Sequence, residues 1–406
     1  MTDRPTEDLL RELAPQVLAG LLRRYGGNQF DICEDAVQEA LIAAVQQWPR
    51  SGRPDDPRAW LLTAARRRLI DQIRSESSRR ERERNEVLLG GALADATSSH
   101  ADDSLQVLEL CCHPALSIPA QIALTLRAVG GLTTAQIAHA YLLPEATVAQ
   151  RISRAKARIR QAGAVFPAPS GTADRLDAVL AVVYVMFSEG HTVASGDSIS
   201  DVDLTDEAIH LARMVSTALP DNGEVAGLLA LLLLTDARRP ARTTAGGMLV
   251  PLDEQDRSLW NRDLIAEGVT ILERTLPRGS AGPYALQAAI AAVHDESLDA
   301  ESTDWAQILA LYRLLERRTG NPVVTLNAAV AEAMVRGPEA GLAAIDRLVA
   351  SGRPVDAQRV SAIRAHLLER HGRVAEAAAE YRESARGTRS LPERDYLLSR
   401  ARRLVD

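Results

Sequence analysis

Residues 132–161 read Leu132-Thr-Thr-Ala-Gln-Ile-Ala-His-Ala-Tyr-Leu-Leu-Pro-Glu-Ala-Thr-Val-Ala-Gln-Arg-Ile-Ser-Arg-Ala-Lys-Ala-Arg-Ile-Arg-Gln161. This stretch predicts a short helix, a tight turn and a longer basic helix. Thr133 or Thr134 suits the N-cap of the first helix, because a Thr hydroxyl can accept from a free amide of the first turn. Pro144 ends that helix, since it has no amide proton, and suits the start of the next one.

The basic helix has two different sides. On a helical wheel, its apolar residues lie within about 60° of one another and predict a buried stripe: Val148, Ile152, Ala155 and Ile159. The far side carries Thr147, Gln150, Arg151, Arg154 and Arg158. Such a helix can enter a DNA major groove. The alternative is an ordinary amphipathic hairpin with a solvated basic face.

The composition predicts a mainly helical protein of two or three domains. The chain has 406 residues, of which 46% are hydrophobic and only 3% aromatic, with abundant Ala and Leu. It contains no run of eighteen apolar residues and no apolar core near its N-terminus, so we expect neither a membrane span nor a secretory signal. Three cysteines (Cys33, Cys111 and Cys112) are too few for a disulfide framework, and we expect a cytoplasmic protein.

The net charge of −7 is unevenly distributed. Residues 58–84 carry nine Arg against four acidic residues, and residues 145–160 carry five basic residues against one acidic residue. Residues 166–406 are acidic overall. Two compact basic segments in the first half indicate an anionic partner for that half alone.

The domain boundaries follow changes in composition. Helical patterns fill 5–84, and 85–104 is small, acidic and rich in Gly and Ser, as expected of a flexible linker. Helical periodicity returns over 105–165, and after the Pro-rich turn at 165–172 it continues through 173–406. In this last part, Leu368 to Ala385 resembles the Gly, Tyr and Ala spacing of a tetratricopeptide unit. An irregular helical bundle is the alternative.

Two upstream motifs extend the interpretation of the hairpin. One is Glu34-Asp-Ala-Val-Gln-Glu-Ala-Leu-Ile-Ala-Ala-Val-Gln-Gln-Trp48, and the other is Pro57-Arg-Ala-Trp-Leu-Leu-Thr-Ala-Ala-Arg-Arg-Arg-Leu-Ile-Asp-Gln-Ile-Arg74. With the hairpin, they resemble the sigma-70 family, specifically its extracytoplasmic-function sigma factors. Cys111-Cys-His-Pro-Ala-Leu116 and the long helical extension are similar to a subgroup with a tetratricopeptide-type C-terminal domain.

The resemblance implies an all-α fold with two small sigma domains, the second containing a helix-turn-helix, before a larger tetratricopeptide-like domain. Region 2 corresponds to 5–84, region 4 to 105–165 and the extension to 173–406. It also implies two partners, promoter DNA and core RNA polymerase. On region 2, the side chains expected to dock on the clamp of the largest polymerase subunit are Glu34, Asp35, Gln38 and Glu39.

Promoter contacts are expected on both sigma regions. In region 2, Thr63, Arg67 and Arg74 are the candidates for contacting the −10 element. In region 4, Gln150, Arg151 and Arg154, next to Thr147, are placed to reach the bases of a −35 element. Lys156, Arg158 and Arg160 are better interpreted as phosphate contacts, because they lie late in the helix or off its reading face.

The remaining features predict no chemistry. Cys111, Cys112 and His113 lack the four suitably spaced ligands of a zinc site, so a buried, weakly polar helix surface is favoured over a metal or redox site. Asp256-Arg257 and Thr303-Asp304-Trp305 are interpreted as caps or buried salt bridges, with a ligand or peptide groove as the alternative. We expect no enzyme activity, cofactor or metal. The extension is expected to regulate activity, and a protein or peptide is its expected partner.

Two other functions stay open from the residues alone. One is a one-component helix-turn-helix regulator whose helical domain senses a ligand. The other is an adaptor whose helical array recruits proteins. The two upstream motifs favour the sigma factor, because an operator-binding regulator needs neither of them.

Overall fold

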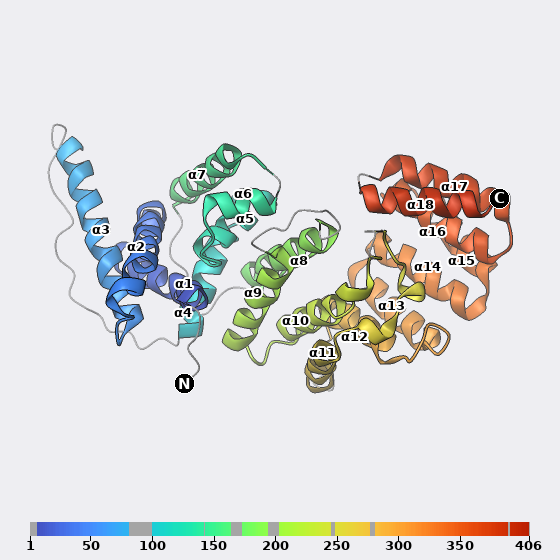
Figure 1. The fold of residues 1–406 in the computed structure, drawn as a ribbon. Coiled ribbons are helices and arrows are strands. Elements are labelled where there is room, and N and C mark those ends of the chain that lie inside the picture. The colour runs from blue at the N-terminus through green and yellow to red at the C-terminus, as the bar shows by residue number, and fades with distance from the viewer. Residues whose placement is uncertain are drawn as a thin grey trace. The chain divides into compact units, whose positions relative to one another are not determined.

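The computed structural model describes residues 6–80, 100–141, 143–163, 173–193, 203–244, 248–276, 281–388 and 390–405. In these ranges the chain is helical apart from turns, loops and one isolated antiparallel bridge between Thr243 and Leu249 (Figure 1). The predicted all-α class is therefore confirmed. The chain forms two compact units: Met1–Phe187 with Ile199–Ala218, and Ser188–Ser198 with Leu219–Asp406.

The first unit contains both predicted sigma domains. Its helices are α1 (Thr6–Tyr25), α2 (Phe30–Ser51), α3 (Pro57–Arg80), α4 (His100–Cys111), α5 (Ile118–Ala128), α6 (Thr134–Ala140), α7 (Glu145–Gln161), most of α8 (Ala173–Val193), and α9 (Leu204–Ala218).

Helices α1, α2 and α3 pack together around an apolar core that includes the fully buried Leu18, Leu22 and Phe30. On α3, the buried stripe runs through Leu61, Ala65 and Leu69. Leu62 and Ile73 lie beside this stripe and are only half-buried, because the packed face of the helix is centred on Leu61, Ala65 and Leu69.

The segment at 49–57, rich in Pro, Gly and Asp, forms a loop only after Ser51. Helix α2 continues through Pro49 to Ser51, where a proline forgoes only one hydrogen bond of the last turn. Gly52 then ends the helix with a φ of 84°, a backbone conformation that favours glycine. Trp48 is buried, and its ring meets that of Trp60 edge to face at 5.5 Å, so both tryptophans pack within the fold.

The hairpin forms as its sequence predicts. Thr133 is the N-cap of α6, and a reciprocal capping box joins it to Gln136. Pro144 precedes the first turn of α7. The predicted stripe of α7 is buried in full: Val148, Ile152, Ala155 and Ile159. It packs against α5, α6 and α2.

Part of the extension belongs to the first unit. Helix α9 packs against α4, and α4 packs against α1. The expected linker over 85–104 lies outside the described residues up to 99, and α4 includes 100–104. The structure groups α9 with the sigma regions. The expected domain boundaries remain a prediction.

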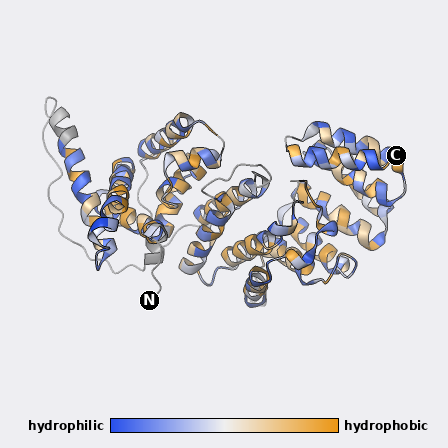
Figure 2. Cartoon of the chain, viewed as in Figure 1, coloured by the Kyte–Doolittle hydropathy of each residue, from blue (hydrophilic) through white to orange (hydrophobic). Residues whose placement is uncertain are grey.

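The second unit is built from consecutive packed helices, as expected of a tetratricopeptide-like array. They are α10 (Gly223–Asp236), α11 (Arg262–Thr275), α12 (Pro283–Glu296), α13 (Trp305–Thr319), α14 (Pro322–Arg336), α15 (Pro338–Ala350), α16 (Ala357–Arg370), α17 (Val374–Gly387) and α18 (Leu391–Arg403), with short 3-10 turns η2 (Arg239–Ala241), η3 (Leu252–Glu254) and η4 (Arg257–Leu259). Helix α10 is predominantly apolar (Figure 2), and most of its residues are buried.

The predicted tetratricopeptide unit places its signature residues in one core. Leu368, Ala377, Tyr381 and Ala385 belong to the same buried cluster of α14–α18. The Tyr381 hydroxyl donates to the Glu369 carboxylate at 2.6 Å. The repeat spacing therefore marks the positions at which neighbouring helices pack.

A buried polar network holds α10, α12 and the segment between α10 and α11 together. Trp260 is buried between two guanidinium groups, with Arg238 at 5.4 Å and Arg257 at 4.8 Å from its ring centroid. Arg238 Nε donates to Asp295 at 2.6 Å. Arg257 donates at 2.7 Å to the carbonyl of His294. The cap and buried-pair interpretation of this region is thus favoured over a ligand groove.

The described ranges contain no helix long and apolar enough to cross a bilayer.

Candidate nucleic-acid and polymerase interface

The outer side of α7 presents the polar residues that the sequence assigned to DNA reading. Thr147, Gln150, Arg154 and Arg158 are exposed, and Arg151 is half-buried. None of these three arginines forms an ion pair with another described residue. Because the opposite side of α7 is buried in the unit, the helix has one fixed side and one side that can enter a groove.

On the flank of α7 that faces α2, by contrast, the basic side chains are paired with carboxylates of the protein itself. Lys156 Nζ contacts Glu34 Oε2 and lies 2.7 Å from Asp35 Oδ1, and the lysine side chain is only 11% exposed. Arg160 pairs with Asp31 one turn further along. Lys156 was expected to contact phosphate, but in this structure its ammonium group is held by α2. The reason is its position directly after Ala155, beside the buried stripe.

Helix α5 completes this contact. Arg127 Nε donates to Glu34 Oε1 at 3.1 Å, and another Arg127 nitrogen donates to the carbonyl of Leu132. Gln38 Nε2 in turn donates to the carbonyl of Arg127 at 3.0 Å. Glu34 is fully buried and Gln38 is 6% exposed. Two of the four residues expected to dock on polymerase thus face region 4.

The other two expected docking residues lie at the surface of α2. Asp35 and Glu39 are exposed, and Glu39 pairs with Arg68 of α3 at 3.4 Å. Ile42 and Val45 extend this surface, each with 53% of its side chain exposed. Our sequence reasoning missed them. The available signal was their spacing, since they follow Asp35 and Gln38 by seven residues, or two helical turns.

The expected −10 residues lie along the exposed side of α3. Thr63, Arg67 and Arg74 are exposed. The Thr63 hydroxyl donates to the carbonyl of Ala59 at 2.8 Å, one turn earlier. The amide of Ala59 donates to Asp56, which caps the start of the helix. The loop before α3 and the polar side of the helix therefore form a continuous exposed surface.

The cysteines lie in apolar surroundings. Cys111 and Cys112 are buried, and Cys112 Sγ lies 4.0 Å from the Thr125 hydroxyl. Burial raises the pKa of Cys33 and of Cys112 to about 12 and raises that of Cys111. These thiols therefore stay protonated and weakly nucleophilic. No group of three or more His, Cys, Asp and Glu side chains in the described ranges is placed to hold a metal ion.

A buried carboxyl marks the contact between α9 and the sigma regions. Glu207 is 5% exposed and its carboxylate lies against Gly130, where an added Cβ would meet it at 2.7 Å. Burial raises the pKa of Glu207 to about 7, although Arg11 of α1 opposes this shift. The extension thus contributes an ionisable group to the packing of region 4.

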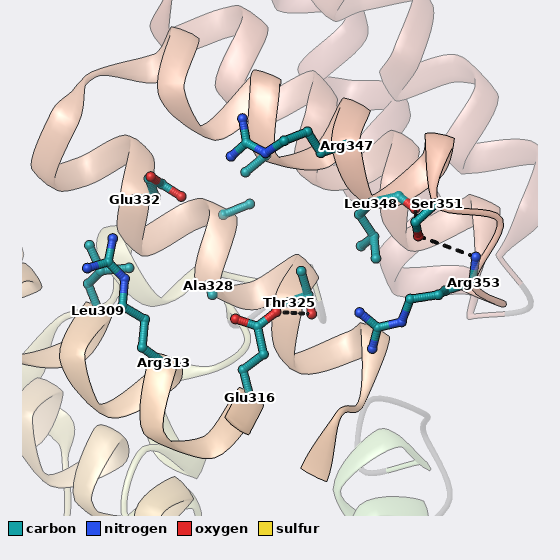
Figure 3. Close-up of a pocket in the computed structure, with 12 residues that line it drawn as sticks. Leu309, Arg313, Glu316, Thr325, Ala328, Glu332, Arg347, Leu348, Ser351 and Arg353 are labelled. Atoms are coloured by element: carbon teal, nitrogen blue, oxygen red, sulfur yellow. Dashed lines mark hydrogen bonds between the residues drawn. The ribbon is translucent and has the colours of Figure 1, made fainter. Parts of the chain in front are cut away.

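The second unit contains a pocket of about 320 Å³ between α13, α14 and α15 (Figure 3). Leu309, Ala328 and Leu348 contribute apolar walls. Its charged lining comprises Arg313, Glu316, Glu332, Arg347 and Arg353. Both glutamates have partners, since Glu316 accepts from Thr325 and Glu332 pairs with Arg336.

Comparison with known families matches three parts of the chain. Sigma-70 region 2 matches residues 9–79, and Sigma-70 region 4 matches residues 108–159. A family of unknown function, DUF6596, matches residues 175–276. The first match spans most of α1–α3, and the second runs from the last turn of α4 to near the end of α7. The expected promoter-reading residues lie on α3 and α7.

Individual proteins extend these matches. An uncharacterized protein of Rhizobium meliloti (strain 1021) is 43% identical over 358 residues, which cover 86% of this chain and 84% of that protein. The ECF RNA polymerase sigma factor SigK of Mycobacterium sp. (strain KMS) is 32% identical over 128 residues, or 29% of this chain and 63% of SigK. The crystal structure of yeast Tom70 has a TM-score of 0.38 at 11% identity, covering 95% of this chain and 83% of that one.

Regions 2 and 4, in this order and on these helices, define a sigma-70 transcription initiation factor. Within that class, the chain belongs to the extracytoplasmic-function type and carries a C-terminal extension.

Proposed function

We propose that this protein binds core RNA polymerase in the cytoplasm and directs it to promoters by reading a −35 element through α7 and a −10 element through α3. The observation that carries the proposal is the outer side of α7. Its arginines are accessible and form no ion pair with the described residues, while the other side of the helix is fixed by buried residues. A major-groove reading helix requires this arrangement.

The polymerase contact is assigned to the exposed surface of α2. Asp35 and Glu39 supply negative charge, which fits a basic clamp and mainly aids orientation and association rate. Ile42 and Val45 supply apolar area. We expect Ile42→Ser/Val45→Ser to weaken core polymerase binding about tenfold with little effect on folding, because both side chains are already half-exposed. Val349→Ser, at a 48% exposed position of the second unit, is the matched control.

Run-off transcription with purified core polymerase tests the proposal. Full-length protein and truncated forms are supplied with promoter templates, and promoter-specific transcripts are the expected result. Two truncations are needed, one ending at Gly163 and one at Ala218, because α9 packs on region 4 and its removal exposes that surface. Absence of specific transcripts and of polymerase binding in all three forms would contradict the proposal.

The second unit is assigned a regulatory role. Comparing the form that ends at Ala218 with the full-length protein gives the sign of that role. If the unit inhibits, truncation raises transcription; if it is required, truncation lowers it. Equal transcription from both forms would remove the regulatory assignment.

The pocket of the second unit is our candidate for partner binding. Arg313 and Arg347 face this pocket without an ion-pair partner among the described residues (Figure 3). Two cations above apolar walls fit a peptide with acidic side chains beside an apolar one. In fluorescence anisotropy with a labelled Glu/Leu peptide, Arg313→Gln/Arg347→Gln should weaken binding at least tenfold. The control is Arg382→Gln, which removes an exposed charge outside the pocket. Equal binding by wild type and the double variant would contradict this assignment.

A further inference from the structure

The segment between α10 and α11 leaves the packed helices and returns to the same place. At its base, the amide of Asn261 donates to the carbonyl of Ala237 at 2.8 Å. Near its end, the Gln255 side chain accepts from the indole N–H of the buried Trp260 at 3.2 Å. Residues 248–256, which we call the strap, therefore belong to a loop whose ends are fixed by the second unit.

The 3-10 turn η3 of the strap contacts the C-terminal helices. Glu254 Oε1 accepts from Arg400 Nη1 of α18 at 2.6 Å, although 146 positions separate the two residues in the sequence. Burial lowers the pKa of His366 on α16, and the Asp253 carboxylate opposes this shift, so Asp253 lies near α16. Burial also raises the pKa of Tyr396 on α18 to about 12, and both strap carboxylates add to this rise. The two acidic residues of the strap therefore lie against α16 and α18.

The surface that receives the strap is held in place by its own helices. Arg400 Nη2 donates to Glu369 of α16 at 2.7 Å, and the other oxygen of this carboxylate accepts from the Tyr381 hydroxyl of α17 at 2.6 Å. Tyr381 is 2% exposed and belongs to the buried cluster of α14–α18. Arginine has several donors in a rigid fork. One side of the Arg400 fork is therefore fixed by Glu369, and the other side is offered to Glu254.

The strap is held less firmly than the surface it covers. Asp253 and Glu254 are exposed, and Pro251 and Leu252 are only half-buried. In the pair of Glu254 with Arg400, the glutamate side chain is 45% exposed and the arginine side chain 22%. Ion pairs that water can reach contribute little to stability. The strap can therefore leave α16 and α18, while the ends of its loop and the Arg400 side chain stay in place.

We propose that His366, Tyr396 and Arg400 form a docking site for a partner segment in which apolar residues precede two acidic residues, and that the strap occupies this site until such a partner displaces it. The strap sequence Pro251-Leu-Asp-Glu254 shows the chemistry that the site accepts. Because the strap is tethered, it competes at a high effective concentration, so the partner must cover more of α16 and α18 than the strap does. This inference goes beyond the proposed function and concerns other residues than those that line the pocket between α13, α14 and α15.

The test measures how a labelled copy of the strap binds to the full-length protein. The probe is a fluorescein-labelled peptide with the sequence of residues 248–256, and fluorescence anisotropy gives its affinity. Asp253→Asn/Glu254→Gln removes the carboxylates of the strap and leaves the docking residues unchanged. Because apparent affinity scales with the fraction of unoccupied sites, this variant should bind the probe at least tenfold more tightly than wild type. Glu273→Gln/Glu301→Gln, which removes two exposed carboxylates elsewhere in the second unit, should bind the probe like wild type.

A second probe tests the chemistry of the site without a change at the docking residues. In this probe, Asn and Gln replace the residues equivalent to Asp253 and Glu254. The Asp253→Asn/Glu254→Gln protein should bind it at least tenfold more weakly than the acidic probe. The same protein with Arg313→Gln/Arg347→Gln added should bind the acidic probe unchanged, because these two arginines line the separate pocket.

Three results would overturn the proposal. Equal affinity of wild type and Asp253→Asn/Glu254→Gln for the acidic probe would show that the strap does not occupy the site. Equal affinity of the variant for the acidic and the neutral probe would refute recognition of acidic side chains. Loss of binding on adding Arg313→Gln/Arg347→Gln would assign the probe to the pocket. None of these measurements involves polymerase or promoter DNA, so they are independent of the proposed function.

Discussion

The two units bury charge in different ways. In the first unit, Lys156 places a compact ammonium group against carboxylates of a helix from another region. In the second unit, Arg257 donates to the backbone carbonyls of His294 and Ser297 and stacks on Trp260. An ammonium group is a flexible point charge, whereas a guanidinium group is a rigid planar fork.

This difference indicates which contacts can be exchanged for others. Carboxylates on α2 can accept any suitably placed cation, and Asp35 is exposed to solvent beside Lys156. Carbonyls at the end of α12 and a buried indole ring offer no comparable route to an outside partner. We therefore expect the contact of Asp35 with Lys156 to be reversible and the contacts around Trp260 to be permanent.

The largest expected effect is on the stability of the second unit, through the buried network around Trp260. Arg238→Ala removes the guanidinium group that donates to Asp295, whose side chain is fully buried. Leaving a buried charge unpaired typically costs about 3–5 kcal/mol. We expect urea unfolding, followed by the fluorescence of Trp260 and Trp305, to show the second unit destabilised by that amount.

The control for this prediction is Arg336→Ala. This arginine is 54% exposed and pairs with Glu332 one helical turn away. Exposed pairs of this kind contribute about 0–1 kcal/mol. Equal losses from Arg238→Ala and Arg336→Ala would contradict the distinction between buried and exposed charge in the second unit.

A smaller effect is expected at Glu207, where the extension meets region 4. Its pKa is raised from 4.5 to about 7 by burial, so its contribution to stability is present below pH 4.5 and is lost as the pH rises through 7. Gln mimics the protonated form. We expect Glu207→Gln to stabilise the first unit at pH 8 by up to about 3 kcal/mol and to have little effect near pH 4.5.

Thermal unfolding of full-length protein at both pH values measures this difference. Asp177→Asn is the control, because it removes an exposed carboxylate elsewhere in the first unit. A stabilisation by Glu207→Gln that does not change with pH would show that the pKa of Glu207 does not differ between the folded and the unfolded protein, and would contradict the raised pKa.

Local features of the fold could be predicted from the sequence. The capping box at Thr133, the turn at Pro144 and the buried stripe of α7 depend on residues within one or two turns. Their hydrogen bonds and packing follow from spacing alone. The exposure of Arg154 and Arg158 follows for the same reason, because a residue opposite a buried stripe faces solvent unless another element covers it.

The features that were missed depend on distant parts of the chain. Nothing near Lys156 indicates that Glu34 lies beside it, since any of 54 acidic residues is an equal candidate in the sequence. The packing of α9 on α4 was missed for the same reason. On α3, Leu61 and Leu62 are both apolar neighbours, and only the position of α2 decides which of them is buried.

The reading side of α7 provides the next comparison, between base and phosphate contacts on one helix. Arg151→Ala or Arg154→Ala should weaken binding to the cognate promoter by about 1–3 kcal/mol and reduce discrimination against a mutated −35 element. Arg158→Ala should weaken binding to both sequences equally. Gel-shift titration of the polymerase complex with both templates measures these effects. Unchanged selectivity in Arg151→Ala and Arg154→Ala would contradict the assignment.

The smallest expected effect concerns two carboxylates on the same helix. Glu39 pairs with Arg68, and both side chains are more than half exposed, whereas Glu34 is buried between two cations. Solvent screens the exposed pair, so Arg68→Ala should change the stability of the first unit by less than about 1 kcal/mol. Urea unfolding of the full-length protein measures this change. A loss of several kcal/mol in Arg68→Ala would contradict the distinction between the exposed pair of Glu39 and the buried pairs of Glu34.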